Sequence, residues 1–210
     1  MPADPDLHFD SDPLRSDSPD TWERLVQAIG PASMLVCIEN RMGANLRRRY
    51  SPEDIWQETL LHVWRDRSRC TWQGVRAFRR WVLTVAYNRL RDLAEHGAAE
   101  KRGGGRPDRS LASRSGSVPP PVQSTTPSRI ASDAEEARLM RAALESLPEE
   151  LREVVRRRLF EEQPVAEVAA ALGLGESAVK HRFRRGAELY RARLEALISQ
   201  APEERRGSGA

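Results

Sequence analysis

Residues 164–190 constrain this chain more than any other stretch, because they encode two adjacent helices of different character. A short apolar helix begins at Pro164, and a second helix with a basic outer face follows Gly173. Closely crossing helices need a small side chain, which Ala169 provides, and a turn residue that accepts a positive φ, which Gly173 provides. Val179 is placed to pack back on the first helix. The pattern predicts a helix-turn-helix, for which DNA is the expected partner.

The second helix of this pair concentrates positive charge. From Glu176 to Arg193 the chain has six Lys or Arg and two Glu, a local charge of +4. With Val179 and Phe183 facing inward, the cations face outward, where such side chains bind phosphates and guanine edges. A hydroxyl near the helix start also suits phosphate. The candidate duplex contacts are Ser177, Lys180, Arg182, Arg184 and Arg185. For the charge run alone, a solvated basic face is the competing interpretation.

The distribution of charge supports a polyanionic partner better than the total does. The 210 residues carry a net charge of only +3. The first 20 residues hold six Asp and one Arg, whereas residues 21–102 hold 15 Lys or Arg and nine Asp or Glu. An acidic leader before a basic domain suits a protein that binds nucleic acid. The leader itself is interpreted as a disordered tail in preference to a regulatory mask that repels DNA.

Strand signals are nearly absent, which predicts an all-α fold of two small helical domains joined by a flexible linker. Residues 103–132 contain Gly103–Gly105 and Pro119–Pro121 and almost no apolar periodicity. A stretch of that length is too long for a loop within one compact domain. The expected organisation is an acidic disordered leader (1–20), a helical domain (21–102), the linker (103–132), a helix-turn-helix domain (133–200) and a disordered tail (201–210).

Capping and periodicity place the helices of the first domain. Ser51, Pro52 and Asp54 form a helix start of the capping-box kind, which predicts a helix over 52–65. Its core-facing residues should be Ile55, Thr59 or Leu60, and Val63. A longer helix is expected over 76–97. Its buried stripe should be Phe78, Val82, Val85 or Ala86, and Leu93, and its polar face Thr84, Tyr87, Asn88, Arg91 and Glu95.

The second domain should contain four helices. The first is expected over about 133–146, and Pro148 should open the next in its first turn. The apolar stripe of that helix should be Leu151, Val154, Val155 and Leu159. The pair of the helix-turn-helix follows, with the last helix running from Glu176 to about Ile198.

Nothing in the sequence points to catalysis. The two cysteines, Cys37 and Cys70, lack the spacing of a metal site and should be reduced structural thiols. The four histidines are scattered, and there is no phosphate-binding glycine loop or nucleophile motif. We therefore expect no enzyme, no cofactor and no metal. With no signal peptide and no apolar run of membrane-spanning length, a cytoplasmic protein is expected.

Three quoted stretches carry a family resemblance. They are Ser-Pro-Glu-Asp-Ile-Trp-Gln-Glu-Thr-Leu-Leu-His-Val-Trp-Arg at 51–65, Ala-Phe-Arg-Arg-Trp-Val-Leu-Thr-Val-Ala-Tyr-Asn-Arg-Leu-Arg-Asp at 77–92, and Leu-Glu-Ser-Leu-Pro-Glu-Glu-Leu-Arg at 144–152. In this order, with a linker between the domains and the helix-turn-helix at the end, they resemble bacterial RNA polymerase sigma factors of the small extracytoplasmic-function (ECF) type in the sigma-70 family.

The resemblance implies a chain that binds core RNA polymerase and directs promoter-specific transcription initiation. The helix at 52–65 would dock on the largest polymerase subunit through Asp54, Gln57 and Glu58, although a solvated helix face is the simpler interpretation of these residues alone. The second domain would read the −35 element as duplex with the candidates given above. The resemblance also allows an anti-sigma factor as a partner.

The first domain would bind the non-template strand of the −10 element, with one base flipped out of the stack. The candidates are Trp72, Gln73, Arg76, Asn88, Arg91, Lys101 and Arg102. Trp72 either stacks on a base or packs in the core. The same two interpretations apply to Tyr87. Lys101 and Arg102 are expected on phosphates.

One stretch departs from the family pattern. Residues 22–45 contain Gly30-Pro31 and Gly43, so their helices should be short. The alternative function is a stand-alone helix-turn-helix regulator, which would bind its operator without polymerase.

Overall fold

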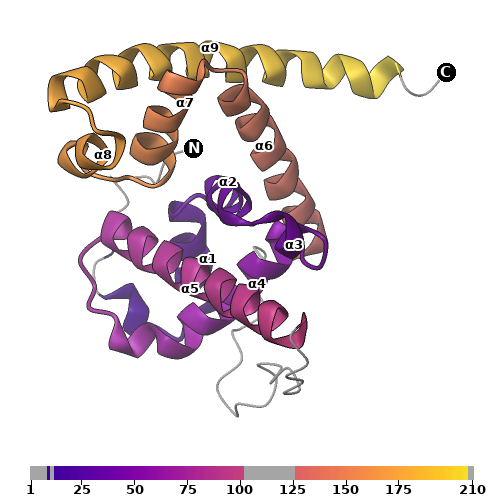
Figure 1. Cartoon of the computed structure of the whole chain (residues 1–210). Helices are drawn as coiled ribbons and strands as arrows, with labels where there is room; N and C mark the ends of the chain where they lie inside the picture. Colours follow the sequence, from indigo (N-terminus) through magenta and orange to yellow (C-terminus); the bar gives the residue numbers. More distant parts are fainter. Residues whose placement is uncertain (1–8, 10–11, 102–125, 208–210) are drawn as a thin grey trace. The chain divides into compact units, whose positions relative to one another are not determined.

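The computed structural model describes residue 9 and residues 12–101 and 126–207, the side chains of 99–101 and 201–207 excepted. Across these described ranges the regular structure is helical, without strands, as the sequence predicted. Contacts divide the chain into two units that meet between Ser132 and Asp133. Each unit builds its own small core from the apolar faces of its helices (Figure 1).

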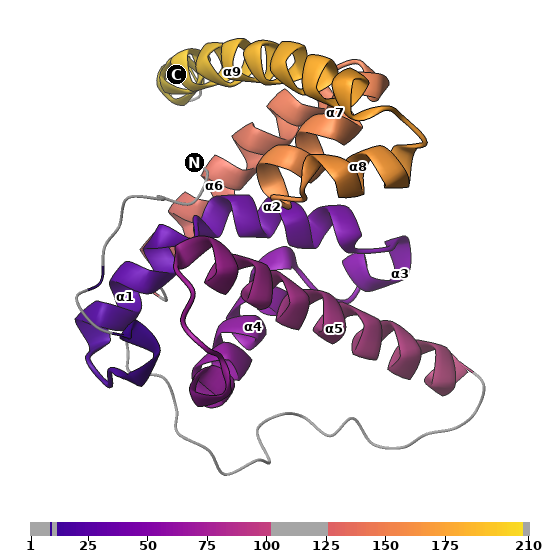
Figure 2. The same cartoon turned by 90° about the vertical axis from the view of Figure 1, so that its left-hand side faces the viewer.

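Helices α2, α4 and α5 form the centre of the first unit. Its elements are η1 (Pro13–Arg15), α1 (Pro19–Ala28), α2 (Pro31–Arg41), α3 (Ala44–Arg47), α4 (Pro52–Asp66), η2 (Arg67–Arg69) and α5 (Val75–Lys101). Helices α2, α4 and α5 contact one another, and residues 31–38 of α2 are all buried (Figure 2). The helices before residue 48 are short, as expected, because Gly30 (φ 71°) and Pro31 break the chain between α1 and α2.

The start of α4 is the capping box that the sequence predicts. The Ser51 hydroxyl accepts from the Asp54 amide at 3.1 Å, and the Asp54 carboxylate accepts from the Ser51 amide at 2.9 Å. Ile55, Thr59 and Val63 are fully buried, together with Leu60, Trp56 and Trp64. The buried Thr59 hydroxyl donates to the Ile55 carbonyl at 2.7 Å, so its burial leaves no unmade hydrogen bond.

Helix α5 buries the expected stripe and one residue that was not expected. Phe78, Val82, Ala86 and Leu93 are buried as predicted. Arg79, however, has 0% of its surface exposed. Its guanidinium donates from Nε to the Ile29 carbonyl and from an Nη to the Ser33 hydroxyl, both at 3.0 Å. These hydrogen bonds of Arg79 therefore connect α5 to the α1–α2 turn within the core.

The leader differs from the sequence prediction over residues 12–20. Asp12 accepts from the Leu14 amide at 3.0 Å and caps η1, and Leu14 is 2% exposed. Pro13 and Leu14 are buried, and η1 contacts α1 and η2, so tertiary contacts hold this stretch against the unit. Residues 1–8, 10 and 11 lie outside the described residues.

The second unit contains α6 (Pro127–Glu145), α7 (Glu149–Val155), the π-helical turn η5 (Arg156–Phe160), α8 (Val165–Leu172) and α9 (Glu176–Gly207). The expected residues Leu151, Val154 and Val155 are buried. Pro148 is the N-cap of α7 rather than its first residue. Because the backbone widens into the π turn, the stripe shifts, and Phe160 is buried at 2% while Leu159 is only half-buried.

Two helix ends in this part of the chain differ from the sequence prediction. Helix α6 begins at Pro127, inside the expected linker, because the Thr126 hydroxyl accepts from the Arg129 amide at 3.4 Å and Pro127 suits the first turn. The rest of that linker, 103–125, lies outside the described residues. Helix α9 continues to Gly207 instead of ending near Ile198.

Replacing Arg79 with alanine should destabilise the first unit by about 2–4 kcal/mol, because it removes two buried hydrogen bonds and leaves a buried carbonyl without its donor. All five tryptophans precede residue 82, so tryptophan fluorescence during urea unfolding reports on this unit alone. The neighbouring exposed Arg80→Ala is the control and should change stability by less than about 0.5 kcal/mol. Equal effects of the two substitutions would contradict the structural role of Arg79.

Candidate nucleic-acid interface

The turn between α8 and α9 has the geometry of a helix-turn-helix. Gly173 adopts φ 63° and ψ 34°, and the Leu174 amide donates to the Ala169 carbonyl at 2.9 Å. Ala169 and Val179 are buried together with Val168 and Val154 in one apolar cluster. The roles predicted for Ala169, Gly173 and Val179 are therefore confirmed.

A second close approach fixes the rotation of α9 about its own axis. A Cβ atom added at Gly186 would lie 2.6 Å from Cγ2 of Val155 and 3.4 Å from Cβ of Leu151. Helix α7 therefore contacts the backbone of α9 directly at Gly186. Tyr190, one turn further along, is buried and meets the Phe160 ring edge-to-face at 5.7 Å. The inward face of α9 is thus set by packing.

The opposite face of α9 is basic and exposed. Ser177, Lys180, Arg184 and Arg185 are exposed, whereas Arg182 is half-buried on the flank of the helix. Lys180 forms only a solvent-exposed pair with Glu176, at 3.7 Å, which does little to hold its side chain. His181 is also exposed and lies close to the middle of this face by helical periodicity. The sequence interpretation placed His181 outward but did not count it among the contacts.

Arg156 and Arg157 differ from the arginines of α9 because acidic neighbours pair with them. Glu153 accepts from both Arg156 and Arg157 at 2.6 Å, and Arg156 also pairs with Glu161. The hydrogen bond from Arg156 is the first cause that lowers the pKa of Glu153. This cluster therefore stabilises the α7–η5 segment, while the cations of α9 remain on the outer surface.

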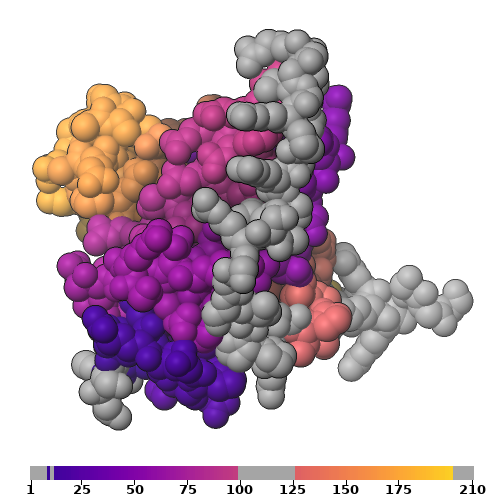
Figure 3. Space-filling model, turned by 90° about the horizontal axis from the view of Figure 1, so that it is seen from below, coloured from indigo at the N-terminus to yellow at the C-terminus, as the bar shows by residue number. Residues whose placement is uncertain are grey.

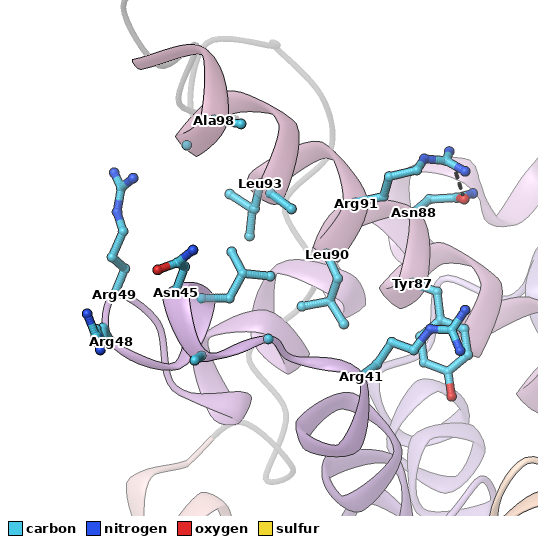
Figure 4. Close-up of a pocket in the computed structure, with 15 residues that line it drawn as sticks. Arg41, Asn45, Arg48, Arg49, Tyr87, Asn88, Leu90, Arg91, Leu93 and Ala98 are labelled. Atoms are coloured by element: carbon cyan, nitrogen blue, oxygen red, sulfur yellow. Dashed lines mark hydrogen bonds between the residues drawn. The ribbon is translucent and has the colours of Figure 1, made fainter. Parts of the chain in front are cut away.

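The first unit has an open cleft of about 900 Å³ between the segment around α3 and the C-terminal half of α5 (Figure 4). Asn88 and Arg91, two of the predicted −10 contacts, line it. Three further arginines line it from the other segment, namely Arg41, Arg48 and Arg49. Among its described lining residues the charged side chains are all arginines, so the cleft carries positive charge.

Two contacts arrange polar side chains at the edge of this cleft. An Nη of Arg91 donates to Oδ1 of Asn88 at 3.1 Å, so that the two residues act together (Figure 4). The Arg41 guanidinium lies 5.1 Å from the centre of the Tyr87 ring, a cation–π distance. Tyr87 is half-buried beneath this arginine and lines the cleft.

The other −10 candidates lie elsewhere in the first unit. Trp72 is half-buried, with its ring centre 6.1 Å from that of the buried Phe78, while Gln73 and Arg76 are exposed beside it. Arg76 and Asn88 are twelve residues apart on α5, about 18 Å along the helix axis. The side chain of Lys101 and the whole of Arg102 lie outside the described residues. The structure thus separates the described candidates into two groups. Trp72, Gln73 and Arg76 form the loop group, and Asn88 and Arg91 form the cleft group.

The three polymerase-binding candidates on α4 have different surroundings. Gln57 is exposed. Asp54 is exposed, but its carboxylate closes the capping box. Glu58 pairs with Arg89 of α5 at 2.6 Å, in a site where Arg89 is only 15% exposed. Glu58 therefore joins α4 to α5, a role that its position in the sequence did not indicate.

The described residues contain no group of three or more His, Cys, Asp or Glu placed to hold a metal ion. None of the described helices has the length and apolarity needed to cross a membrane.

The fold and this basic face define a helix-turn-helix DNA-binding protein, and comparisons narrow the class. Residues 39–98 match the family model for Sigma-70 region 2, and residues 137–195 match that for Sigma-70, region 4. The ECF RNA polymerase sigma factor SigL from three strains of Mycobacterium tuberculosis is 30% identical over 149 residues, covering 69% of this chain and 75% of SigL. This chain therefore belongs to the ECF sigma factors.

A solved structure of CnrH in complex with the cytosolic domain of CnrY is also similar. It is 22% identical, covers 87% of this chain and 90% of that chain, and has a TM-score of 0.33. Membership of the sigma family carries its function: the protein binds core RNA polymerase and promoter DNA, with region 2 for the −10 element and region 4 for the −35 element, and it is not an enzyme.

Gly173→Ser should destabilise the helix-turn-helix by about 1–2 kcal/mol, because a residue with a Cβ is strained at positive φ. Thermal unfolding followed by circular dichroism measures the loss, while tryptophan fluorescence should be unchanged because every tryptophan is in the first unit. Gly175→Ser is the matched control: its φ is not positive, no atom lies within 4 Å of an added Cβ, and serine suits a helix start. A similar loss in both variants would refute the backbone argument.

Proposed function

We propose that this ECF sigma factor reads its promoter with two separate basic surfaces and meets core polymerase with the exposed side of α4. The observation that carries the proposal is the division of α9 into a packed face and a cationic face. The two reading modules are joined through residues 102–126, so that binding of one raises the effective concentration of the other at the promoter. We place this activity in the cytoplasm, where core polymerase works.

The −35 duplex is assigned to the outward face of α9. Ser177, Lys180, Arg184 and Arg185 contact the major groove and its phosphates, His181 joins them, and Arg182 contacts the backbone from the flank. The support is their common exposure opposite Val179 and Gly186. Because packing fixes that rotation, these side chains reach the groove without a rearrangement of the domain.

The −10 strand is assigned to the loop group and the cleft group together. Asn88 and Arg91 contact bases from the cleft, and Arg48, Arg49 and Arg41 neutralise phosphates around them. Trp72, Gln73 and Arg76 hold the flipped base, with Trp72 as the stacking surface. Lys101 and Arg102 are kept as phosphate contacts on the grounds of charge alone.

Core polymerase is assigned to α4, chiefly through Gln57. Asp54 contributes its remaining carboxylate surface and Glu58 contributes through the position of α4, which its pair with Arg89 maintains. Gln57 is the informative residue for substitution, because a change at Asp54 or Glu58 would also alter a contact within the protein.

The overall assignment is tested by in vitro transcription with core polymerase on a library of genomic promoters. Specific transcripts should require both the protein and the core enzyme. Specific binding of the protein alone to a duplex operator, with no core-dependent transcripts, would instead indicate a stand-alone regulator.

Arg185→Ala should weaken binding of holoenzyme to the cognate −35 duplex by about 1–3 kcal/mol, because it removes a contact to a base edge. Arg193→Ala removes the same charge from an exposed position two turns further along α9 and serves as the control. Fluorescence anisotropy of labelled duplexes with matched and altered −35 elements measures both. Equal weakening on every duplex by both variants would mean that Arg185 acts through charge only.

Asn88→Ala should slow promoter opening while leaving core binding intact, because Asn88 contacts the strand from the cleft and packs into no core. Permanganate reactivity of promoter thymines measures opening, and co-purification with core measures assembly. Thr84→Ala, one turn earlier on the same exposed side of α5, is the control and should open promoters normally. Loss of core binding by Asn88→Ala would show that this residue is structural.

A further inference from the structure

The described part of the leader, Phe9 and residues 12–20, lies beside the same loop that the proposed function assigns to the flipped base. Helix η1, which contains the buried Leu14, contacts η2 at the entrance to that loop. Figure 3 shows the indigo surface of the N-terminal segment directly beside the purple surface of the α4 region. The leader therefore belongs to the surface around residues 67–76.

Phe9 occupies space beside the candidate stacking residue. Its ring meets the Trp72 ring edge-to-face, with the centres 5.5 Å apart. On its other side, the Arg24 guanidinium of α1 lies 5.2 Å from the centre of the Phe9 ring. Since Trp72 also packs on Phe78, its indole is flanked by aromatic rings from the leader and from the core. An incoming base must share Trp72 with Phe9 or displace it.

Acidic residues of the leader reach the same region. Asp17 pairs with Arg67 at 2.5 Å, and that guanidinium lies 3.6 Å from the centre of the Trp64 ring. The Asp12 carboxylate is near Cys70: after burial, it is the second cause that raises the pKa of that thiol. These contacts join the leader to η2 and to the start of the loop.

The leader therefore presents to this loop the same two chemical features as single-stranded DNA, an aromatic ring and negative charge. Its first 20 residues carry six Asp and one Arg. The ring contacts the residue that would stack on a base, and a carboxylate pairs with a nearby arginine. Two ligands of the same chemistry cannot both occupy one small loop, so their binding must be competitive.

We propose that Phe9 and residues 12–17 are an internal competitor for the −10 strand, with Phe9 covering Trp72 and Asp17 neutralising Arg67 until single-stranded DNA displaces them. The inference rests on the proposed role of Trp72 in strand binding. It assigns the leader a function in limiting DNA binding by the protein before a promoter strand is available.

The test measures binding of a fluorescein-labelled oligonucleotide, (dT)20, to the full chain. Phe9→Ala should tighten binding about three- to tenfold, which is the range expected when one aromatic pair is removed. Phe9→Tyr keeps the ring and should bind as the unchanged protein does. Tighter binding by Phe9→Tyr, or no change in Phe9→Ala, would overturn the proposal.

A charge-matched pair tests the acidic contact. Asp17→Asn removes the partner of Arg67 and should tighten binding, whereas Asp20→Asn removes the same charge at an exposed position in the first turn of α1 and should have less effect. Equal effects would show that the leader acts through net charge and not through this contact. Thermal unfolding of each variant identifies any loss of folded protein.

Trp72→Ala separates the inference from the proposed function on which it rests. If the strand assignment is right, Trp72→Ala weakens (dT)20 binding, and Phe9→Ala gives no gain in the Trp72→Ala background. If Trp72→Ala binds normally, the assignment of Trp72 to the strand is wrong. If Trp72→Ala weakens binding while Phe9→Ala changes nothing, only the competition is refuted.

Discussion

The close crossing of α7 and α9 at Gly186 is the constraint on which the DNA-reading face depends. With no Cβ at this position, Val155 reaches the α9 backbone and the helix cannot rotate without a clash. Val179 and Tyr190 are consequently directed inward, and the cations between them are directed outward. The direction of the proposed −35 contacts is thus set by packing on the inner face of α9.

The first unit shows how a buried charge and a surface pair can organise a small core. Arg79 joins α5 to the α1–α2 turn, and Glu58 joins α4 to Arg89 of α5. Both contacts connect helices that also carry proposed contact residues. The orientation of the cleft and loop groups is therefore maintained by residues that are polar but largely enclosed by protein.

Features with local causes could be predicted from the sequence. The capping box at Ser51, the turn at Gly173 and the apolar stripes of α4 and α5 depend on neighbours within a few residues. The features that the sequence did not predict depend on residues that are distant along the chain. An arginine such as Arg79 is expected at the surface, and only its distant partners Ile29 and Ser33 explain its burial. Arg48 and Arg49 line a cleft only because α5 lies opposite them in the fold. The π turn at 156–160 and the ordered residues 12–20 likewise arise from tertiary contacts.

The spacing along α5 has a consequence for the length of DNA that the protein can read. Arg76 and Asn88 are separated by about 18 Å along the axis and by about a third of a turn around it. A strand stacked at about 3.4 Å per nucleotide needs about five nucleotides to cover that distance. Under the proposed assignment, the backbone of α5 sets the distance between these two contacts, and a change of either side chain would leave that distance unaltered.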